Sequence, residues 1–256
     1  DYGSVAVIGG TDGMIGASIL AARAALISGA GRVTLECRAE HAPHVDMVYP
    51  EIMFATKPVN LEDFDAIVLG CGLGTSAEAK ARVIEALNCQ KPLILDADAL
   101  NIIAADIKLQ DMVLARRAPT VLTPHPGEAA RLLRRDTAGV TADRVAACRE
   151  LAVQTGAIVV LKGAGTVISM KVSRPLNTRS LSSRIYRENT SATMKENTLC
   201  AMDVAVEKTD FTMFIKLDES PLERVAMKSA KLCSIFSTAA VSSEASSISR
   251  SSCAHW

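Results

Sequence analysis

The stretch SVAVIGGTDGMIGASILAARAALISGAGRVTLE, residues 4–36, decides the fold. Its apolar run at 4–8 predicts a buried strand, and a glycine-rich turn follows at 9–16. Residues 17–28 are almost wholly Ala, Leu and Ile, which predicts a helix buried on most faces. Two glycines then end this helix, and residues 32–36 form the next predicted strand. A strand, helix and strand in this order indicate parallel strands with a right-handed crossover.

The same alternation continues along the chain. Further strands are predicted at 65–69, 92–95, 120–123 and 158–161. Helices are predicted at 77–87, with Ser76 as N-cap, at 129–134 and at 141–155. Six strands thus alternate with helices through residue 169. This pattern predicts an α/β fold with a mostly parallel central sheet flanked by helices.

The composition excludes several classes of protein. The 256 residues include 28 basic and 28 acidic side chains, so no basic excess points to a nucleic acid or membrane partner. No apolar run approaches the ~18 residues of a membrane span. The seven cysteines contain no Cys-x-x-Cys pair, so neither a zinc site nor a disulfide framework is indicated. The expected location is therefore the cytoplasm.

Several strand ends carry residues suited to ligand binding. A second glycine turn, 70–74, follows a predicted strand, and Asp96 and Asp98 follow the next one. These two aspartates fit either helix capping or a site role. His125 lies between two prolines that fix the backbone around it, which favours contact with a ligand. Ligands of open α/β sheets bind at the carboxyl ends of strands.

The first glycine turn also fits a dinucleotide site in part. Glu36 ends the second strand about 20 residues after the turn, where a Rossmann fold places its ribose-binding acid. The glycine spacing is G-x-x-G-x-x-G rather than G-x-G-x-x-G. The alternative is that these glycines only permit close packing of helix and sheet.

A last candidate follows the strand at 158–161. Lys162, Gly163, Ala164, Gly165 and Thr166 offer a charge, two glycines and a hydroxyl. Backbone N–H groups in such a turn form a concave anion site, although a plain β-turn has the same pattern. The order of residues excludes a Walker A loop.

The chain changes character near residue 170. All 15 glycines lie at or before Gly165, and 16 of the last 86 residues are serine, against five in the first 170. We therefore divide the chain into an α/β domain at 1–170, which is incomplete, and a divergent, Ser-rich, Gly-free segment at 171–256 that is partly disordered.

Together, the motifs of residues 3–169 resemble those of the ADP/ATP-dependent NAD(P)H-hydrate dehydratases, a family with a ribokinase-like fold. The similarity rests on seven short motifs in the same order: Gly9–Ala17, Gly29–Thr34, Pro50–Met53, Gly72–Gly74, Leu95–Asn101, Leu122–Glu128 and Lys162–Ala164. The His-Pro-Gly-Glu sequence resembles that of the bacterial branch, which implies ADP rather than ATP as phosphate donor.

This resemblance implies a function in nicotinamide nucleotide repair. The substrate would be NADHX or NADPHX, which is NADH or NADPH hydrated at C6 of the nicotinamide ring. The nucleotide would phosphorylate the new hydroxyl, and loss of phosphate would restore the ring double bond. By the match, Ala17, Gly74 and His125 would contact the substrate, and residues 162–166 would hold the phosphate end of ADP. Mg²⁺ normally accompanies such a transfer.

One family motif is missing from the sequence. The family continues with Gly-x-Gly-Asp, whose glycines form an anion hole and whose aspartate is the general base. No Gly-x-Gly-Asp occurs in the 256 residues, so we assign no catalytic base and expect impaired activity. The alternatives are an inactive nucleotide-binding remnant and another ribokinase-like small-molecule kinase. The resemblance is also compatible with a homo-oligomer and with an epimerase domain fused upstream.

Overall fold

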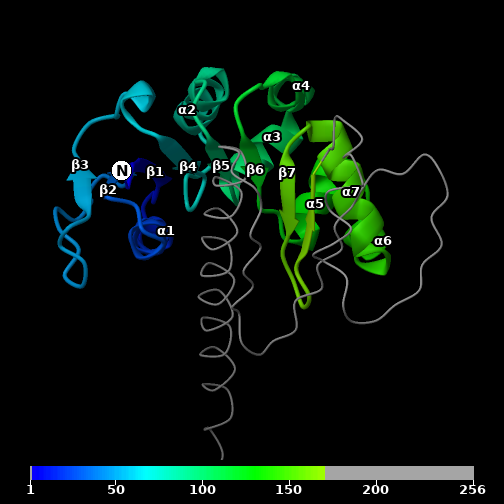
Figure 1. Ribbon diagram of the computed structural model, residues 1–256, viewed down its shortest axis with the longest axis horizontal. Helices are drawn as coiled ribbons and strands as arrows, with labels where there is room; N and C mark the ends of the chain where they lie inside the picture. Colours follow the sequence, from blue (N-terminus) through cyan, green and yellow to red (C-terminus); the bar gives the residue numbers. More distant parts are fainter. Residues whose placement is uncertain (1, 171–256) are drawn as a thin grey trace, which may run out of the picture.

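The computed structural model describes residues 2–170, which form an eight-stranded sheet with helices on both faces (Figure 1). The segment 171–256 and the partial disorder expected for it lie outside the described residues. The strands are β1 (Ser4–Gly9), β2 (Arg32–Cys37), β3 (Met53–Ala55), β4 (Ala66–Leu69), β5 (Leu93–Leu95), β6 (Thr120–Leu122), β7 (Ile158–Leu161) and β8 (Val167–Ser169).

The strand order is β3-β2-β1-β4-β5-β6-β7-β8. Every neighbouring pair is parallel except β7 and β8, which are antiparallel. The chain proceeds outward from β1 to β3, then returns to the other side of β1 and proceeds from β4 to β8. The direction of strand addition therefore reverses between β1 and β4. Open α/β sheets bind ligands at the carboxyl ends of the strands around such a switch point.

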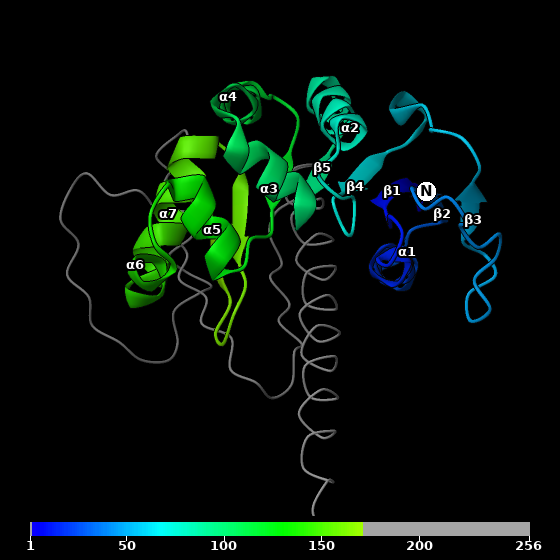
Figure 2. The same ribbon diagram turned by 180° about the vertical axis from the view of Figure 1, so that it is seen from behind.

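Helices cover both faces of this sheet. They are α1 (Ile15–Ile27), α2 (Ala77–Asn88), α3 (Asp98–Ala105), α4 (Ile107–Ala115), α5 (Pro126–Leu133), α6 (Thr137–Ala142) and α7 (Arg144–Thr155), with a 3-10 helix at Leu61–Asp63. Figures 1 and 2 show α1 on the face opposite to α2 and α4. No helix in the described part of the chain has both the length and the apolarity required to cross a membrane.

The strand residues supply two separate apolar cores. Successive side chains of a strand point to opposite faces, so in β4 Ile67 and Leu69 join the core beneath helices α2 to α7. Val68, between them, joins the core that includes α1. The small side chains of α1 let this helix lie close to β1 and β2, and four of its alanines are buried. The continuous apolar runs in the sequence follow from burial of both faces.

The structure differs from the sequence prediction in several elements, and it contains α3 and α4, for which no helix was predicted. It adds β3 and β8, which are three residues each and too short to show periodicity. The single helix predicted at 141–155 is wrong, because Asp143 ends α6 and caps α7 by accepting a hydrogen bond from the Ala146 N–H. The helix predicted at 129–134 begins earlier, at Pro126. The predicted N-cap Ser76 is confirmed, since its side chain accepts from the Ala79 N–H.

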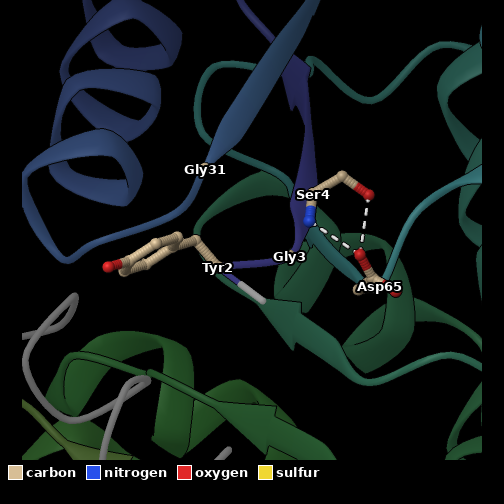
Figure 3. A pocket seen from close by; sticks show the side chains of 5 residues that line it. All are labelled: Tyr2, Gly3, Ser4, Gly31 and Asp65. Carbon is tan, nitrogen blue, oxygen red and sulfur yellow. Dashed lines mark hydrogen bonds between the residues drawn. The ribbon is translucent and has the colours of Figure 1, made fainter.

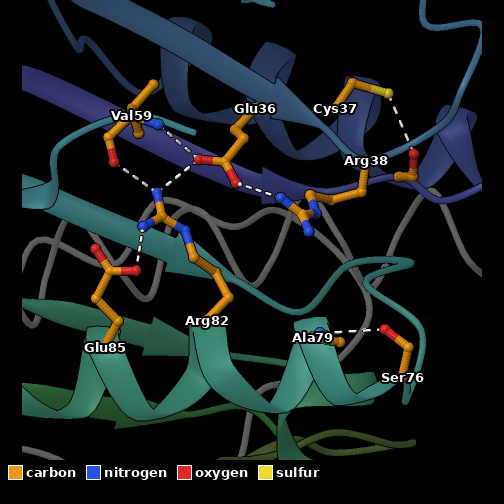
Figure 4. A network of polar contacts seen from close by, with 9 residues as sticks. Glu36, Cys37, Arg38, Val59, Ser76, Ala79, Arg82 and Glu85 are labelled. Atoms are coloured by element: carbon orange, nitrogen blue, oxygen red, sulfur yellow. Dashed lines mark hydrogen bonds and ion pairs between the residues drawn. The ribbon is translucent and has the colours of Figure 1, made fainter. Parts of the chain in front are cut away.

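Glu36 forms a buried ion pair with Arg82 of α2 (Figure 4). The Arg82 Nη2 atom lies 2.6 Å from Glu36 Oε2, which also accepts from the Val59 N–H at 2.9 Å. The second carboxylate oxygen lies 3.3 Å from Arg38 Nη1. Both oxygens are thus bound within the protein, and the residue is 2% exposed. The structure contradicts the ribose-binding role considered for Glu36.

Removing Arg82 would leave a buried carboxylate without its partner. We expect Arg82→Met to lower the free energy of unfolding by about 3–5 kcal/mol. Glu85→Gln is the matched control, because Glu85 pairs with the same guanidinium but is exposed, and it should cost less than about 1 kcal/mol. Urea unfolding of the full chain measures both. Equal losses in the two variants would contradict a dominant role for Glu36–Arg82.

A second ion pair anchors the connection between β2 and β3 to α1. The Asp46 carboxylate accepts from Arg23 Nε and Nη2, each at 2.6 Å, and from the Val48 N–H at 2.9 Å. The hydrogen bonds from Arg23 are the main reason why the pKa of Asp46 falls from 3.8 to about 2. The ionised carboxylate therefore stabilises the folded chain.

The contribution of Asp46 should depend on pH. A depressed pKa stabilises the fold above the unfolded value of 3.8, and this stabilisation is lost as the pH falls toward about 2. We expect Asp46→Asn to destabilise the chain clearly at pH 6, roughly half as much at pH 3 and little at pH 2, as measured by urea unfolding at each pH. Exposed Asp111→Asn serves as control. A loss independent of pH would show that shape, not charge, matters at this position.

Candidate functional site

The loops that follow the parallel strands bring most of the predicted site residues together at the carboxyl ends of the strands. We call this end of the sheet the carboxyl edge. The turns after β1 and β4 are in direct contact. Gly10 N donates to Cys71 O at 3.0 Å, and Thr11 N donates to Gly72 O at 2.7 Å. These bonds join the two turns across the switch point.

Two glycines are required by this close approach of backbones. A Cβ atom on Gly9 would lie 2.2 Å from Cys71 O, and one on Gly70 would lie 2.0 Å from Asp96 O. Gly70 also has a φ of +123°, which L-residues rarely adopt. At these two positions the nearest approach is that of a neighbouring loop, rather than of a helix, and it requires glycine. Gly13 and Gly16 differ, because a Cβ on either would meet nothing within 4 Å.

Two of the three predicted substrate-binding residues lie beside the switch point. Ala17 is exposed in the first turn of α1, directly after the β1 turn. Gly74 lies in the β4 turn, where its N–H donates to Asp98 Oδ2 at 2.8 Å. A Cβ on Gly74 would be 3.4 Å from the Thr11 side chain, so the two turns remain in contact here. Contact of either residue with a substrate stays a prediction.

His125, the third predicted residue, follows β6 and is held as its two prolines predicted. It is the N-cap of α5, and its Nδ1 accepts from the Gly127 N–H at 3.0 Å. Glu128 completes a capping box by accepting from the His125 N–H at 2.8 Å. The imidazole is half exposed, and its Nε2 lies 3.3 Å from Glu128 Oε1. A rigid backbone therefore presents a half-exposed ring at the strand edge.

Asp96 is the residue that joins the separate strand ends. Its Oδ1 accepts from Lys162 Nζ at 2.6 Å and from Thr123 Oγ1 at 2.8 Å. The carboxylate at the end of β5 thereby holds residues that follow β6 and β7. Neither Asp96 nor Asp98 caps α3 with its side chain, and the N-cap is Ala97, so the capping interpretation is wrong. The sequence signal for a site role of Asp96 was the occurrence of two carboxylates directly after a buried strand.

The predicted phosphate loop, 162–166, follows β7 and is held by a residue that the sequence analysis missed. Arg144 of α7 donates to the carbonyl oxygens of Leu161, Lys162 and Ala164. A Cβ on Gly163 would lie 2.9 Å from Arg144 Nη2, so the guanidinium packs directly against the glycine. Arg144 lies far from the loop in sequence and on a helix, where an arginine has no distinguishing pattern.

The loop after β7 lies against the loop that carries His125. Lys162 N donates to Pro124 O at 2.8 Å, immediately before His125 in the chain. Residues 163–165 are exposed, whereas the Lys162 amine is directed to Asp96. The structure thus places the expected nucleotide loop beside one expected substrate residue.

Charges at this edge of the sheet influence one another. Burial raises the pKa of the Glu128 carboxyl, and the neighbouring Lys162 amine opposes that rise. Within residues 2–170, no group of three His, Cys, Asp or Glu side chains is arranged to hold a metal ion. Asp96 and Asp98 are bound to Lys162 and Gly74, respectively. A Mg²⁺ ion at this end of the sheet would therefore need ligands from a bound nucleotide.

A cavity without predicted site residues lies at the amino ends of the strands, at the opposite end of the sheet from these loops. It has a volume of about 560 Å³ and lies where Tyr2, Gly3 and Ser4 meet Gly31 and Asp65 (Figure 3). The Ser4 N–H and Oγ both donate to Asp65 Oδ2, and the backbone hydrogen bond is the main cause of the lowered pKa of Asp65. None of the predicted site residues lines this cavity.

Comparison with known proteins identifies relatives of this chain. Residues 5–184 match the family model described as NAD(P)H-hydrate dehydratase. The ADP-dependent (S)-NAD(P)H-hydrate dehydratase of Neisseria meningitidis is 43% identical over 174 residues, which is 66% of this chain and 58% of the relative. The chain therefore spans a little over half the length of that relative.

Solved structures share the fold. The ADP/ATP-dependent NAD(P)H-hydrate dehydratase of Bacillus subtilis, co-crystallised with ATP and Mg²⁺, has a TM-score of 0.53 at 28% identity, covering 66% of this chain and 61% of that chain. A ribokinase-like superfamily protein of Enterococcus faecalis has a TM-score of 0.53 at 26% identity, covering 65% and 60%. The expected ribokinase-like fold is confirmed.

The importance of Asp96 for this edge can be measured without a ligand. We expect Asp96→Asn to lower the free energy of unfolding by about 1.5–3 kcal/mol, because the charge-assisted bond to Lys162 is lost. Amide hydrogen exchange should accelerate at residues 162–166 more than elsewhere in the sheet. Asp136→Asn makes the same change at an exposed helix N-cap, where asparagine caps equally well. Unchanged exchange at 162–166 would contradict the anchoring role.

Proposed function

Because the chain belongs to the NAD(P)H-hydrate dehydratase family, we propose that it acts in the ADP-dependent dehydration of NADHX or NADPHX to NADH or NADPH. The observation that carries the proposal is the joining of the strand-end loops. Asp96 holds Lys162, and the Lys162 N–H bonds to Pro124 next to His125. The loop expected to bind ADP therefore adjoins a residue expected to bind substrate.

The reaction is a phosphoryl transfer followed by an elimination. The substrate hydroxyl at C6 attacks the terminal phosphorus of ADP, and the bond between that phosphorus and the AMP oxygen breaks. The hydroxyl proton passes to solvent. The C6–O bond of the phosphate ester then breaks and releases inorganic phosphate, while the adjacent ring carbon loses a proton and the ring double bond forms. The net products are the reduced dinucleotide, AMP and phosphate. Phosphorylation helps because phosphate is a far better leaving group than hydroxide.

We propose distinct roles for the two groups of residues. Ala17, Gly74 and His125 contact the hydrated dinucleotide, supported by their position around and beyond the β1–β4 switch point. Residues 162–166 contact the phosphate end of ADP, supported by the exposed glycines and by Arg144, which donates hydrogen bonds to the loop carbonyls. Mg²⁺ is expected to enter with the nucleotide, since it is commonly held by phosphates and few protein ligands.

A second candidate function is nucleotide binding without turnover. Its specific support is that the sequence contains no Gly-x-Gly-Asp. Loss of a positioned general base costs ~10²–10⁴-fold in rate, and loss of an oxyanion-type site costs a similar factor. A kinase for another small alcohol is the third alternative. We further propose a cytoplasmic location, self-association into a homo-oligomer and an epimerase domain fused upstream; these follow from the family resemblance.

Turnover by the full chain distinguishes these candidates. Purified protein with NADHX, ADP and Mg²⁺ should form NADH, followed by its fluorescence, at a rate ~10²–10⁴-fold below that of an enzyme with a positioned base. Calorimetry that detects ADP binding without NADH formation would favour the second function. Transfer of labelled phosphate to another alcohol would favour the third. Absence of both binding and turnover would refute the nucleotide site.

The two residue groups can be separated by paired variants. We expect His125→Ala to raise KM for NADHX with little effect on the Kd for ADP. Lys162→Met should do the reverse, because it releases the 162–166 loop from Asp96 but leaves the capping box of His125 intact. If both variants change both constants equally, the assignment of separate roles is wrong. Thermal unfolding of each variant controls for loss of folded protein.

A further inference from the structure

A second cavity lies at the carboxyl ends of β2 and β3, outside the residues assigned above. Its volume is about 140 Å³. It is lined by the end of β2 and by the segment that follows β3: Glu36, Cys37, Arg38, Ala55, Thr56, Lys57 and Pro58. Figure 4 shows three of these lining residues, Glu36, Cys37 and Arg38, with Glu36 directed toward Arg82 and Val59. The proposed reaction gives this cavity no role.

The charges around this cavity favour an anion. Arg38 and Lys57 contribute two positive charges, whereas Glu36 is the one acidic side chain of the lining. Glu36 lies 2.6 Å from the buried guanidinium of Arg82, which also pairs with the exposed Glu85. Arg38 contacts Glu36 only at 3.3 Å, and its side chain is 26% exposed. An arginine has five N–H donors, so this contact leaves donors to bind a phosphate.

The cavity adjoins the first glycine turn. Arg38 N donates to Gly9 O at 2.9 Å, and the Cys37 thiol donates to Gly10 O at 3.2 Å. The next residue of the turn, Thr11, contacts the β4 turn that carries Gly74. Neighbouring strands lie about 4.8 Å apart, so the end of β2 is roughly 10 Å from the end of β4. One nucleotide unit can span this separation.

In the dinucleotide-binding Rossmann fold, the residue after the second strand depends on the ribose that is bound. An acid there binds the ribose 2′-hydroxyl of a dinucleotide, whereas an arginine accommodates a 2′-phosphate. Glu36 is unavailable for the first role because both its oxygens are bound within the protein. Arg38, two residues later, and Lys57 on the facing segment provide the second chemistry.

We infer that the cavity between β2 and β3 binds the ribose 2′-phosphate of the dinucleotide and makes the protein prefer the phosphorylated substrate. The inference rests on the proposed function, because it places the adenosine end of the same substrate. Gly74 and His125 would then lie toward its nicotinamide end. Arg38 and Lys57 determine specificity and take no part in the chemical step.

Binding of NADP⁺ and NAD⁺ to the full chain tests the inference. These stable dinucleotides differ only in the 2′-phosphate and can be titrated by calorimetry without ADP. We expect NADP⁺ to bind on the order of tenfold more tightly than NAD⁺, as for one charge-assisted phosphate contact. Lys57→Gln should remove most of that difference by weakening NADP⁺ alone. Lys108→Gln, which removes an exposed lysine of α4, should preserve it.

A second variant and a competitor distinguish the source of the phosphate. Arg38→Gln should act like Lys57→Gln, with circular dichroism and thermal unfolding to confirm the fold. Adenosine 2′-monophosphate should compete with NADP⁺ more strongly than inorganic phosphate does. Equal competition by inorganic phosphate would indicate a nonspecific anion site and overturn the inference.

The outcomes also separate this inference from the proposed function. If NADHX is converted but NADP⁺ and NAD⁺ bind equally, the function stands and the phosphate cavity is refuted. If no turnover occurs but NADP⁺ is preferred and Lys57→Gln abolishes the preference, the cavity stands and the reaction is refuted. If neither dinucleotide binds, the inference is wrong.

Discussion

The carboxylate of Asp96 is the interaction on which the candidate site depends. It is buried at the end of β5 and accepts from Lys162 after β7 and from Thr123 after β6. A charge removed from water is stable only when its partners are well placed, so this carboxylate requires three loops to hold one arrangement. The position of Lys162, and through it that of the 162–166 loop, follows from that requirement.

At the β1 and β4 turns, close contacts between backbones also fix the loops relative to one another. The β1 and β4 turns bond directly, and Gly70 brings the β4 turn against Asp96 O at a distance that excludes a side chain. One continuous set of contacts therefore runs from the β2 end through the glycine turns to Asp96 and Lys162. A ligand that binds along this edge meets loops fixed by one another rather than independent segments.

Carboxylates at the strand ends serve different purposes according to their partners. Glu36 is neutralised by Arg82 and stabilises the packing of α2 against β2. Asp98 fixes the backbone of Gly74, and Glu128 fixes that of His125. Asp98 and Glu128 thus act on residues assigned to substrate binding, whereas Glu36 lies beside the cavity proposed for the phosphate. None of these partners can be assigned from the sequence, because each partner lies on another element or depends on the geometry of a cap.

The sequence by itself determined the βα alternation, the parallel sheet and the strand ends that carry chemistry, because buried parallel strands require continuous apolar runs and tight turns require glycine. It also showed the rigid setting of His125, since two prolines restrict the backbone locally. Only the tertiary structure decided that Glu36 pairs with Arg82, that Asp96 holds Lys162 and that Arg144 supports the 162–166 loop. These contacts join residues 46, 66 and 20 positions apart. Side chains so distant meet only when the sheet order is set, and sequence spacing contains no record of that order.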